Sequence, residues 1–423
     1  MRSDHLLYQI EGFLLVFCLT VYGLWFLIRH LSRTRPDLRI GRAITAAVAI
    51  RLVTAVAISL LPNSRALRGP DELLFLAAAD DLRANSLVEL LTGEGIVPLH
   101  QWVFAVQQRL FEASDLTLRL TQIALAVAGL ALLATVVHDL AGPAAARLAA
   151  WLLAFEPTSV FFSGYLHKEP LITFVVGVAA YGFLLMWRDR SLKALVVICA
   201  GCVVATLTRP YVGWLLTGAA VAIILHAAIR TQHGRRATVL TATAIGFMAV
   251  GGTVALREAP SQLERLQASQ EANLTGSANL TYESVDYSTP VAIARNLPVR
   301  VSAFLLRPYP WQLQNTNQQL GAVGGLVVLM VLLLVVASLL RSRGEIITRG
   351  APLIYVGCGL ILAYSVTAAN AGTAFRLREN VTAVLICVGC ALWARREAPT
   401  RAPLAGELLA EPARCDHRTP VRA

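Results

Sequence analysis

Long apolar runs, separated by short polar connections, make up most of this chain. Most of these runs approach the roughly 20 residues that a helix needs to cross the hydrocarbon core of a bilayer. They are continuously apolar and do not alternate, so they indicate helices and not the strands of a membrane barrel. We therefore predict an all-α polytopic membrane protein with about 11 transmembrane helices. The expected spans are 10–28, 43–61, 119–137, 145–162, 170–187, 194–208, 211–229, 237–256, 319–340, 351–369 and 380–394.

Basic residues gather after the first, fifth, seventh, ninth and eleventh of these spans. Short loops rich in Lys and Arg stay in the cytoplasm. Placing all of them inside predicts an N-terminus outside and a C-terminus in the cytoplasm. The residues concerned are Arg29, Arg33, Arg35, Arg39, Arg42, Arg188, Arg190, Lys193, Arg230, Arg235, Arg236, Arg341, Arg343, Arg349, Arg395 and Arg396.

The composition agrees with a membrane protein. Hydrophobic residues make up 56% of the chain and its mean hydropathy is +0.60, which excludes a soluble globular protein. The net charge of +11 is explained by arginines in short loops, so we predict no nucleic-acid partner. Cys199 with Cys202 and Cys387 with Cys390 have the spacing of a redox or zinc pair. Both pairs lie inside spans without His or carboxylate partners, so we interpret them as packing residues.

Two long polar segments, 62–118 and 257–318, fall on the outer side in this orientation. In the first, residues 80–91 and 99–111 carry apolar side chains at helical spacing, which predicts helices lying at the membrane surface. The chain thus divides into an extra N-terminal span with its Arg-rich cytoplasmic loop, a transmembrane domain with the two outer loops, and a disordered cytoplasmic tail. The boundaries of these three parts are 1–42, 43–394 and 395–423.

Three connections on the predicted outer face place cations at the start of a helix. They are His167-Lys168-Glu169-Pro170, Arg209-Pro210 and Arg376-Leu377-Arg378-Glu379-Asn380, in which Pro suits the first turn and Asn the cap. A cation at this positive end of the helix dipole costs about 0.3–1 kcal/mol. Backbone N–H groups and a nearby cation together bind phosphate, so we predict a phosphate or diphosphate site. The alternative is that these side chains only reach lipid headgroups.

Two ionisable residues lie inside predicted spans. Arg51 is near the middle of span 43–61, and Glu156 precedes Pro157 within span 145–162. An isolated charge at such a depth costs about 2.5–3.5 kcal/mol on insertion scales, so each should face a partner or a cavity. The two residues could pair with each other, which would be a structural role, or could serve a functional one.

These features together resemble the GT-C superfamily of membrane glycosyltransferases. The resemblance rests on an apolar helix, an outer loop that opens with the acidic pair Asp71-Glu72, surface helices, and then many spans with cations at their outer ends. It covers about residues 43–394 and is strongest to the protein-mannosyltransferase-like branch, which includes bacterial lipid A aminoarabinose transferases. Segments similar to those of other bacterial multi-pass proteins are Ser163–Pro170, Thr208–Val212, Arg307–Trp311 and Phe375–Glu379.

The resemblance implies an enzyme that moves a sugar from a polyprenyl-phosphate donor to an acceptor hydroxyl on the outer face of the bacterial inner membrane. One loop carboxylate would act as general base, and cations would stabilise the departing phosphate. Carried onto this chain, Asp71 is the candidate base and Glu72 its partner. The candidate donor-binding or phosphate-binding residues are Lys168, Arg209, Arg376, Arg378, Arg307, His100 and His167. No soluble acceptor-binding domain follows the last span, which favours a lipid-borne or glycan-borne acceptor.

The residues leave several alternatives open. Asp71-Glu72 could instead cap a helix through residues 73–81, and a lone His such as His100 is more often incidental. A polysaccharide polymerase or ligase would rely on outer arginines and would not need Asp71. A transporter or flippase for a lipid-linked glycan would carry its charges along a path at the midplane. We expect a lipid-linked donor, a lipid or glycan acceptor and membrane lipids as partners, and no cofactor. A divalent metal stays open but is not predicted, because no dense set of His and carboxylate ligands is present.

Overall fold

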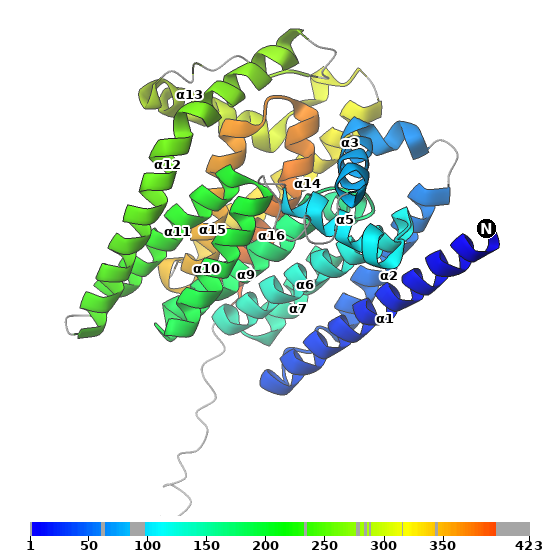
Figure 1. The fold of residues 1–423 in the computed structure, drawn as a ribbon. Coiled ribbons are helices and arrows are strands. Elements are labelled where there is room, and N and C mark those ends of the chain that lie inside the picture. The colour runs from blue at the N-terminus through cyan, green and yellow to red at the C-terminus, as the bar shows by residue number, and fades with distance from the viewer. Residues whose placement is uncertain are drawn as a thin grey trace, which may run out of the picture.

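The computed structural model describes residues 2–60, 64–84, 98–231, 235–275, 280–282, 286, 289–314, 316–342 and 346–394, and this part of the chain is built from helices (Figure 1). The first group is α1 (Arg2–Thr34), α2 (Gly41–Leu60), α3 (Ser64–Ala84), α5 (Leu99–Phe111), α6 (Asp115–Ala141), α7 (Pro143–Phe155), α8 (Pro157–Ser163) and α9 (Glu169–Arg188). The second group is α10 (Leu192–Thr208), α11 (Pro210–Ile229), α12 (Arg235–Thr275), α13 (Pro290–Leu306), η1 (Pro310–Gln312), α14 (Thr316–Ser342), α15 (Ile346–Thr367) and α16 (Ala371–Trp393).

Seven helices in the described residues are long and apolar enough to cross a membrane, which confirms the prediction of a helical chain with several spans. The predicted number of about 11 spans is not confirmed. The seven segments are Gln9–Thr34 of α1, Gly41–Leu60 of α2, Asp115–Ala141 of α6, Glu169–Arg188 of α9, Pro210–Ile229 of α11, Gly321–Arg341 of α14 and Gly350–Thr367 of α15.

The span expected at 145–162 is two short helices. Pro157 cannot donate a backbone hydrogen bond, so it suits the start of a helix and not its interior. The carboxylate of Glu156 accepts hydrogen bonds from the backbone N–H groups of Thr158, at 3.2 Å, and Ser159, at 2.5 Å. Glu156 is therefore the N-cap of α8, and the apolar run breaks at this residue.

Three further expected spans differ in length from the helices observed. The run at 194–208 forms α10, which has 17 residues. The run at 237–256 is part of α12, which has 41 residues, so the predicted outer loop 257–318 begins as a continuation of this helix. The run at 380–394 belongs to α16, whose first half also carries the charged residues Arg376, Arg378 and Glu379.

The surface segments follow the expectation in part. The helix predicted at 99–111 is confirmed as α5. Of the helix predicted at 80–91, only residues 80–84 are described, and they form the end of α3. Because α3 begins at Ser64, Asp71 and Glu72 lie inside this helix, and the alternative that they cap a helix through residues 73–81 is wrong. The predicted tail at 395–423 lies outside the described residues.

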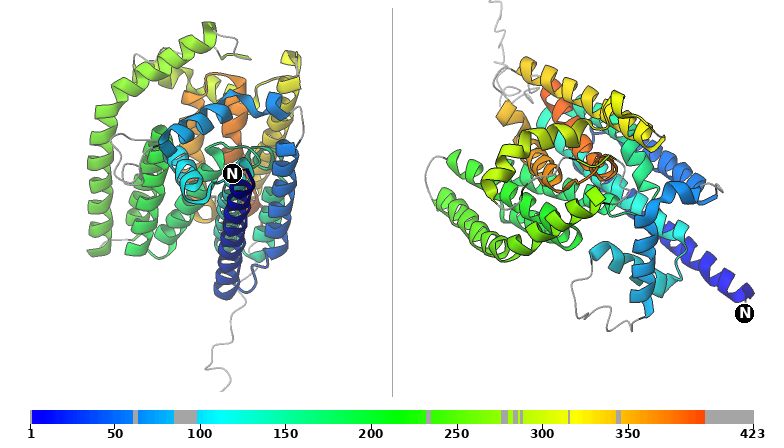
Figure 2. Two further views of the ribbon diagram at one scale, coloured as in Figure 1. Left: turned by 45° about the vertical axis from the view of Figure 1, so that its right-hand side comes forward. Right: turned by 90° about the horizontal axis from the view of Figure 1, so that it is seen from above.

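The centre of the bundle is formed by α6, α9 and α16, which carry many of its fully buried side chains. Helix α6 also packs on α7, α2 and α1, while α16 packs on α14 and α15. Helices α1 and α12 lie at opposite edges of the bundle in Figure 1 and in the right-hand view of Figure 2. The spanning window of α1 is only 11% buried, so this helix presents most of its surface outward.

Helix α1 is tied to the bundle at its C-terminal end. Arg35, just after α1, forms a bidentate pair with Asp139 near the end of α6, at 2.7 and 2.6 Å. Arg188, at the end of α9, donates to the same carboxylate at 3.0 Å. A bidentate Arg–carboxylate pair fixes orientation as well as distance. The Arg-rich connection predicted between the first two spans therefore anchors the extra helix to the core.

The close approach of α6 and α9 depends on two glycines, and we predict that side chains there are not tolerated. A Cβ atom added at Gly177 would lie 2.7 Å from the carbonyl oxygen of Gly129, which is backbone and cannot yield easily. Gly177→Val should therefore destabilise the protein by about 1–3 kcal/mol or more through overpacking. The measurement is thermal unfolding in detergent. Gly218→Val on α11, where an added Cβ meets open space, is the matched control. Equal melting temperatures for the two variants would contradict this packing.

Candidate functional site

The predicted cations do begin two of the three helices. Lys168 is the N-cap of α9, and Arg209 is the N-cap of α11. The third expectation is wrong, because α16 begins at Ala371 and its N-cap is Asn370, whose side chain accepts a hydrogen bond from Thr373 N at 2.8 Å. Arg376 and Arg378 consequently lie in the second turn of α16. Asn380, which the sequence pattern favoured as the cap, lies inside α16.

Glu169, the first residue of α9, lies at the centre of a group of cations. Its side chain is fully buried and forms an ion pair with Arg209. The Nε atom of Arg376 lies 3.0 Å from the same carboxylate oxygen. These contacts join the start of α9, the junction of α10 and α11, and the second turn of α16. We call Lys168, Glu169, Arg209 and Arg376 the Glu169 cluster.

The Glu169 cluster explains how buried cations are tolerated at helix N-termini. A carboxylate in the first turn is favoured by the helix dipole, and its charge compensates the arginine that faces it. Arg209 is 1% exposed, and its Nε and Nη1 atoms have no hydrogen-bond partner among the described residues. Three cations around one carboxylate leave an excess of positive charge. The cluster can therefore accept an anion whose oxygens reach the remaining N–H groups.

Glu169 stands in one of the predicted motifs but is not among the predicted site residues. A signal was present in the sequence: a carboxylate directly precedes Pro170 and opens a strongly apolar helix, where an unpaired charge would be costly. Such a residue needs a cationic partner from another segment. The partner, Arg209, lies 40 positions along the chain, and no local pattern distinguishes it from the other arginines.

Glu72 connects the surface helix α3 to the core. Its carboxylate is fully buried and lies 2.5 Å from Nη2 of Arg119 on α6. The other carboxylate oxygen accepts a hydrogen bond from Leu166 N at 3.5 Å, and Arg119 also donates to the carbonyl of Gly164. Glu72 and Arg119 together hold α3 against the turn that leads into the Glu169 cluster. Arg119 was missing from the predicted set.

Asp71 precedes Glu72 within α3. Its side chain is outside the part of the structure that is described. Its predicted role as general base stays a prediction, as does the catalytic role of Glu72.

His100 and His167 lie beside the Glu169 cluster, around the ring of Phe75. The centroid of the Phe75 ring is 4.8 Å from that of His100 and 6.0 Å from that of His167. The Nζ atom of Lys168 lies 5.6 Å from the centre of the same ring. Helices α3 and α5 thus bring Phe75 and His100 to the segment that precedes α9. The Phe75 contacts and the Glu169 cluster together bring five of the seven predicted phosphate-binding residues close to one another.

His100 is a neutral member of this group. Burial, together with the nearby charges of Lys168 and Arg209, lowers the pKa of His100 to about 3. Neither ring nitrogen has a hydrogen-bond partner among the described residues. At neutral pH this imidazole offers hydrogen bonds to a ligand but no positive charge.

Arg378 and Arg307 lie in a different group from the Glu169 cluster. Arg378 donates from Nε to the carbonyl of Phe304, at 2.5 Å, and from Nη2 to the carbonyl of Arg307. These bonds satisfy carbonyls at the C-terminal end of α13. The guanidinium of Arg307 lies 5.5 Å from the ring centre of Tyr282 and 5.7 Å from that of Tyr309. The predicted phosphate-binding set is therefore divided between two groups that flank the start of α16.

The alternative that Arg51 and Glu156 pair is not met by a direct ion pair among the residues that the structure describes. Arg51 donates instead to the carbonyl of Ala154 and to Oγ of Ser159, both at 2.9 Å. Ser159 in turn lies 3.2 Å from a carboxylate oxygen of Glu379. Glu156 caps α8, as described above. Both buried charges are thus used in holding the break between α7 and α8 against α2 and α16.

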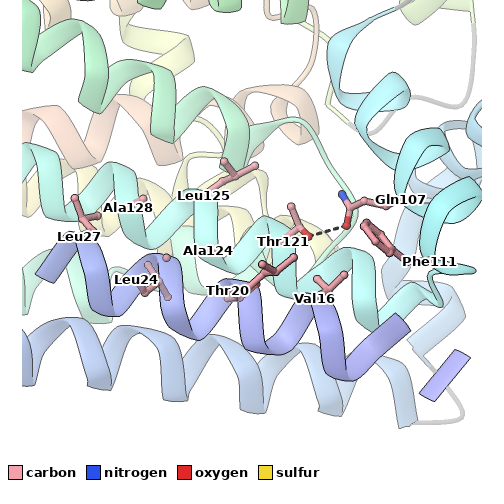
Figure 3. A pocket seen from close by; sticks show the side chains of 12 residues that line it. Val16, Thr20, Leu24, Leu27, Gln107, Phe111, Thr121, Ala124, Leu125 and Ala128 are labelled. Atoms are coloured by element: carbon pink, nitrogen blue, oxygen red, sulfur yellow. Dashed lines mark hydrogen bonds between the residues drawn. The ribbon is translucent and has the colours of Figure 1, made fainter. Parts of the chain in front are cut away.

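Within the described ranges, no group of three or more His, Cys, Asp or Glu side chains is placed to hold a metal ion. A groove of about 380 Å³ lies between α1 and α6 and is closed at one end by α5 (Figure 3). Its lining is apolar apart from three residues, and a hydrogen bond of 2.7 Å joins Thr121 to Gln107 at its α5 end. No charged side chain lines it, so this groove cannot supply the chemistry of the Glu169 cluster.

Comparison with known proteins gives one family. The sequence model of the dolichyl-phosphate-mannose-protein mannosyltransferase family matches residues 96–253. This stretch extends from the residues before α5 into α12 and contains Lys168, Glu169 and Arg209. No curated protein and no solved structure shows a significant match. The family match points to a membrane glycosyltransferase.

The depressed pKa of His100 predicts a loss of stability in mild acid. Above the ordinary pKa of 6.5 the imidazole is neutral in both states and has no effect. As the pH falls from 6.5 towards about 3, the unfolded chain takes up a proton that the folded protein does not, so the free energy of unfolding decreases. At about pH 5 the loss should be about 2 kcal/mol. Thermal unfolding in detergent at neutral pH and at about pH 5 measures it. His100→Gln should lose less stability than the parent, and an equal loss would contradict the assignment.

Proposed function

We propose that this chain is a GT-C glycosyltransferase of the protein-mannosyltransferase-like branch. It transfers a sugar from a polyprenyl-phosphate donor to a hydroxyl of a lipid-borne or glycan-borne acceptor. The observation that carries the proposal is the Glu169 cluster, a set of cations gathered around one buried carboxylate at one end of a membrane bundle. The family match covers three of its four members.

The donor phosphate binds at the Glu169 cluster. Arg209 keeps two donor atoms unused among the described residues, and the N-termini of α9 and α11 add the positive ends of two helix dipoles. Arg376 is the more accessible arginine, with 16% of its side chain exposed. Hydrogen bonds from charged donors to phosphate are about twice as strong as neutral ones. The same groups stabilise the negative charge that collects on the phosphate as it leaves.

The acceptor hydroxyl is activated by Asp71. The hydroxyl oxygen attacks the anomeric carbon of the sugar while the bond from this carbon to the phosphate oxygen breaks. The electron pair of that bond leaves with the phosphate, and the hydroxyl proton passes to the Asp71 carboxylate. The neighbouring Glu72, through its pair with Arg119, holds α3 beside the turn that leads to Lys168. This anchoring supports a base on α3 acting close to a phosphate held at α9.

The active face is the outer face of the bacterial inner membrane, and the C-terminus is cytoplasmic. Support comes from the last residue of α9, Arg188, which opens a short connection that also contains Arg190 and Lys193. The first residue of α9 lies in the Glu169 cluster, and Arg188 joins the basic group around Asp139. Short loops rich in arginine stay inside, so the end with Arg188 is the cytoplasmic one. The Glu169 cluster then lies outside.

The rival functions fit the contacts less well. A polymerase or ligase that depends on outer arginines would use Arg307 and Arg378 together with Arg209. Two of the three guanidinium nitrogens of Arg378, Nε and Nη2, instead donate to the backbone carbonyls of Phe304 and Arg307. A flippase would need charged groups along a path at the midplane. Lys168 and Arg209 of the Glu169 cluster instead lie at the starts of α9 and α11, and Arg376 lies in the second turn of α16.

The proposal predicts that Asp71→Asn abolishes transfer. Asparagine keeps the size of the side chain but cannot accept the proton, and loss of a general base lowers the rate about 10²–10⁴-fold. The assay follows release of polyprenyl phosphate from polyprenyl-phosphate hexoses, with mannose first, in membranes that contain the protein. Asp81→Asn, an exposed position on the same helix, is the matched control and should keep parental activity. Parental turnover by Asp71→Asn would contradict the proposed chemistry and favour the arginine-based rival.

A further inference from the structure

A pair of stacked aromatic rings projects from the segment that follows α13. Trp311 is 79% exposed, which is unusual for the largest apolar side chain. Its ring lies against that of Tyr309, with centroids 5.0 Å apart and planes inclined by 23°. Tyr309 covers only a small part of the indole. The rest of the ring is open and available to a ligand.

The backbone beneath this pair is firmly held. Tyr309 and Gln312 exchange two hydrogen bonds, from Gln312 N to the Tyr309 carbonyl at 2.8 Å and from Tyr309 N to the Gln312 side chain at 3.0 Å. The buried Pro308 packs on α14 at Gly321, where an added Cβ would lie 3.2 Å from its ring. The aromatic pair is therefore positioned in advance, and a ligand that binds there does not have to order a loose loop.

A cation accompanies the pair. The guanidinium of Arg307 lies 5.7 Å from the ring centre of Tyr309, and the carbonyl of Arg307 accepts a hydrogen bond from Arg378. Arg378 is two residues from Arg376 of the Glu169 cluster on the same turn of α16. The aromatic pair and the Glu169 cluster thus lie at the same end of the bundle, on two sides of the start of α16.

We propose that Tyr309 and Trp311, with Arg307 beside them, form a binding platform for a sugar ring of a glycan acceptor. The face of a pyranose presents C–H groups with partial positive charge, and these pack on the negative face of an aromatic ring. The guanidinium N–H groups of Arg307 donate to sugar hydroxyls. The inference rests on the proposed function and deepens it, because it selects a glycan-borne acceptor over a purely lipid one.

Another stacked pair, on α7, has the surroundings expected of a pair that faces lipid. Trp151 lies against Phe155 on α7, with centroids 5.8 Å apart and planes inclined by 5°, among the exposed apolar residues Leu148 and Leu152. Trp311 is instead followed in sequence by Gln312 and Gln314, with Leu313 between them, and has an arginine near its stacking partner. Polar neighbours and a nearby hydrogen-bond donor favour a sugar over an acyl chain.

The test measures binding of free trisaccharides to the purified full chain in detergent, without any donor. The probes are mannotriose, maltotriose and chitotriose, and saturation-transfer NMR reports which sugar protons contact the protein. We expect at least one trisaccharide to bind through its ring C–H protons. Trp311→Leu should weaken this binding about three- to tenfold, whereas Trp311→Phe should retain most of it. The matched control is Trp151→Leu, which removes a stacked tryptophan from α7 and should leave binding unchanged.

Two outcomes would overturn the platform. One is the lack of any trisaccharide binding that depends on Trp311. The other is that vesicles of headgroup-brominated phosphatidylglycerol strongly quench the Trp311 fluorescence and that trisaccharides do not change this quenching. The Trp311 fluorescence is the difference between the parent and Trp311→Phe. The second outcome would assign the pair to membrane anchoring. The binding test measures no transfer, so failure of the proposed chemistry and failure of the platform can be told apart. Trisaccharide binding that persists in Asp71→Asn would show that the platform does not depend on the proposed general base.

Discussion

The site depends on the buried ion pair between Glu169 and Arg209, which Arg376 extends. A helix N-terminus is an unfavourable place for a cation, and Lys168 and Arg209 lie at the N-termini of α9 and α11. Glu169 makes this arrangement stable, because its carboxylate occupies the favoured first turn of α9 and compensates the arginine opposite. Removing one partner of a buried pair leaves an uncompensated charge, which typically costs about 3–5 kcal/mol. The same contacts hold α9, α11 and α16 together at the end of the bundle where the chemistry is proposed.

The second requirement is that the surface helices stay over this end. The pair of Glu72 with Arg119 and the contacts of Phe75 with His100 fix α3 and α5 beside the segment that begins α9. The two ion pairs therefore have different roles. The pair of Glu169 with Arg209 arranges the cations, and the pair of Glu72 with Arg119 positions the helix that carries Asp71. A glycosyltransferase needs both, since the phosphate and the acceptor must be held at the same time.

The continuous apolar runs predicted the class of fold but not where individual helices begin and end. Long apolar runs with few charges indicated helices at 43–61, 119–137 and 211–229, and the observed helices lie there. The break at Glu156 and the early start of α16 depend on which side chain caps a helix end, and that choice is made by tertiary contacts. Competing caps such as Asn370 and Asn380 look equivalent in a sequence.

The candidate site was predictable to a similar degree. Motifs beside helix starts brought Lys168 and Arg209 into the predicted set, because misplaced charges are visible in a sequence. Pairings were not visible: which arginine faces Glu169, and that Arg378 serves the carbonyls of α13, depend on how distant helices meet. The predicted cationic residues therefore fall into two groups: Lys168, Arg209 and Arg376 lie around Glu169, whereas Arg307 and Arg378 lie at the end of α13.

The central claim is that the Glu169 cluster binds the phosphate of a lipid-linked sugar, and binding of undecaprenyl phosphate tests it most directly. The measurement compares undecaprenyl phosphate with undecaprenol, which lacks the phosphate, on purified protein in detergent. The parent should prefer the phosphate form, and Arg376→Gln should weaken its binding about tenfold or more, as expected for loss of a hydrogen bond between charged groups. Arg109→Gln, an exposed cation on α5, should bind as the parent does. Equal affinity of the parent for the two lipids, or unchanged binding by Arg376→Gln, would contradict the claim.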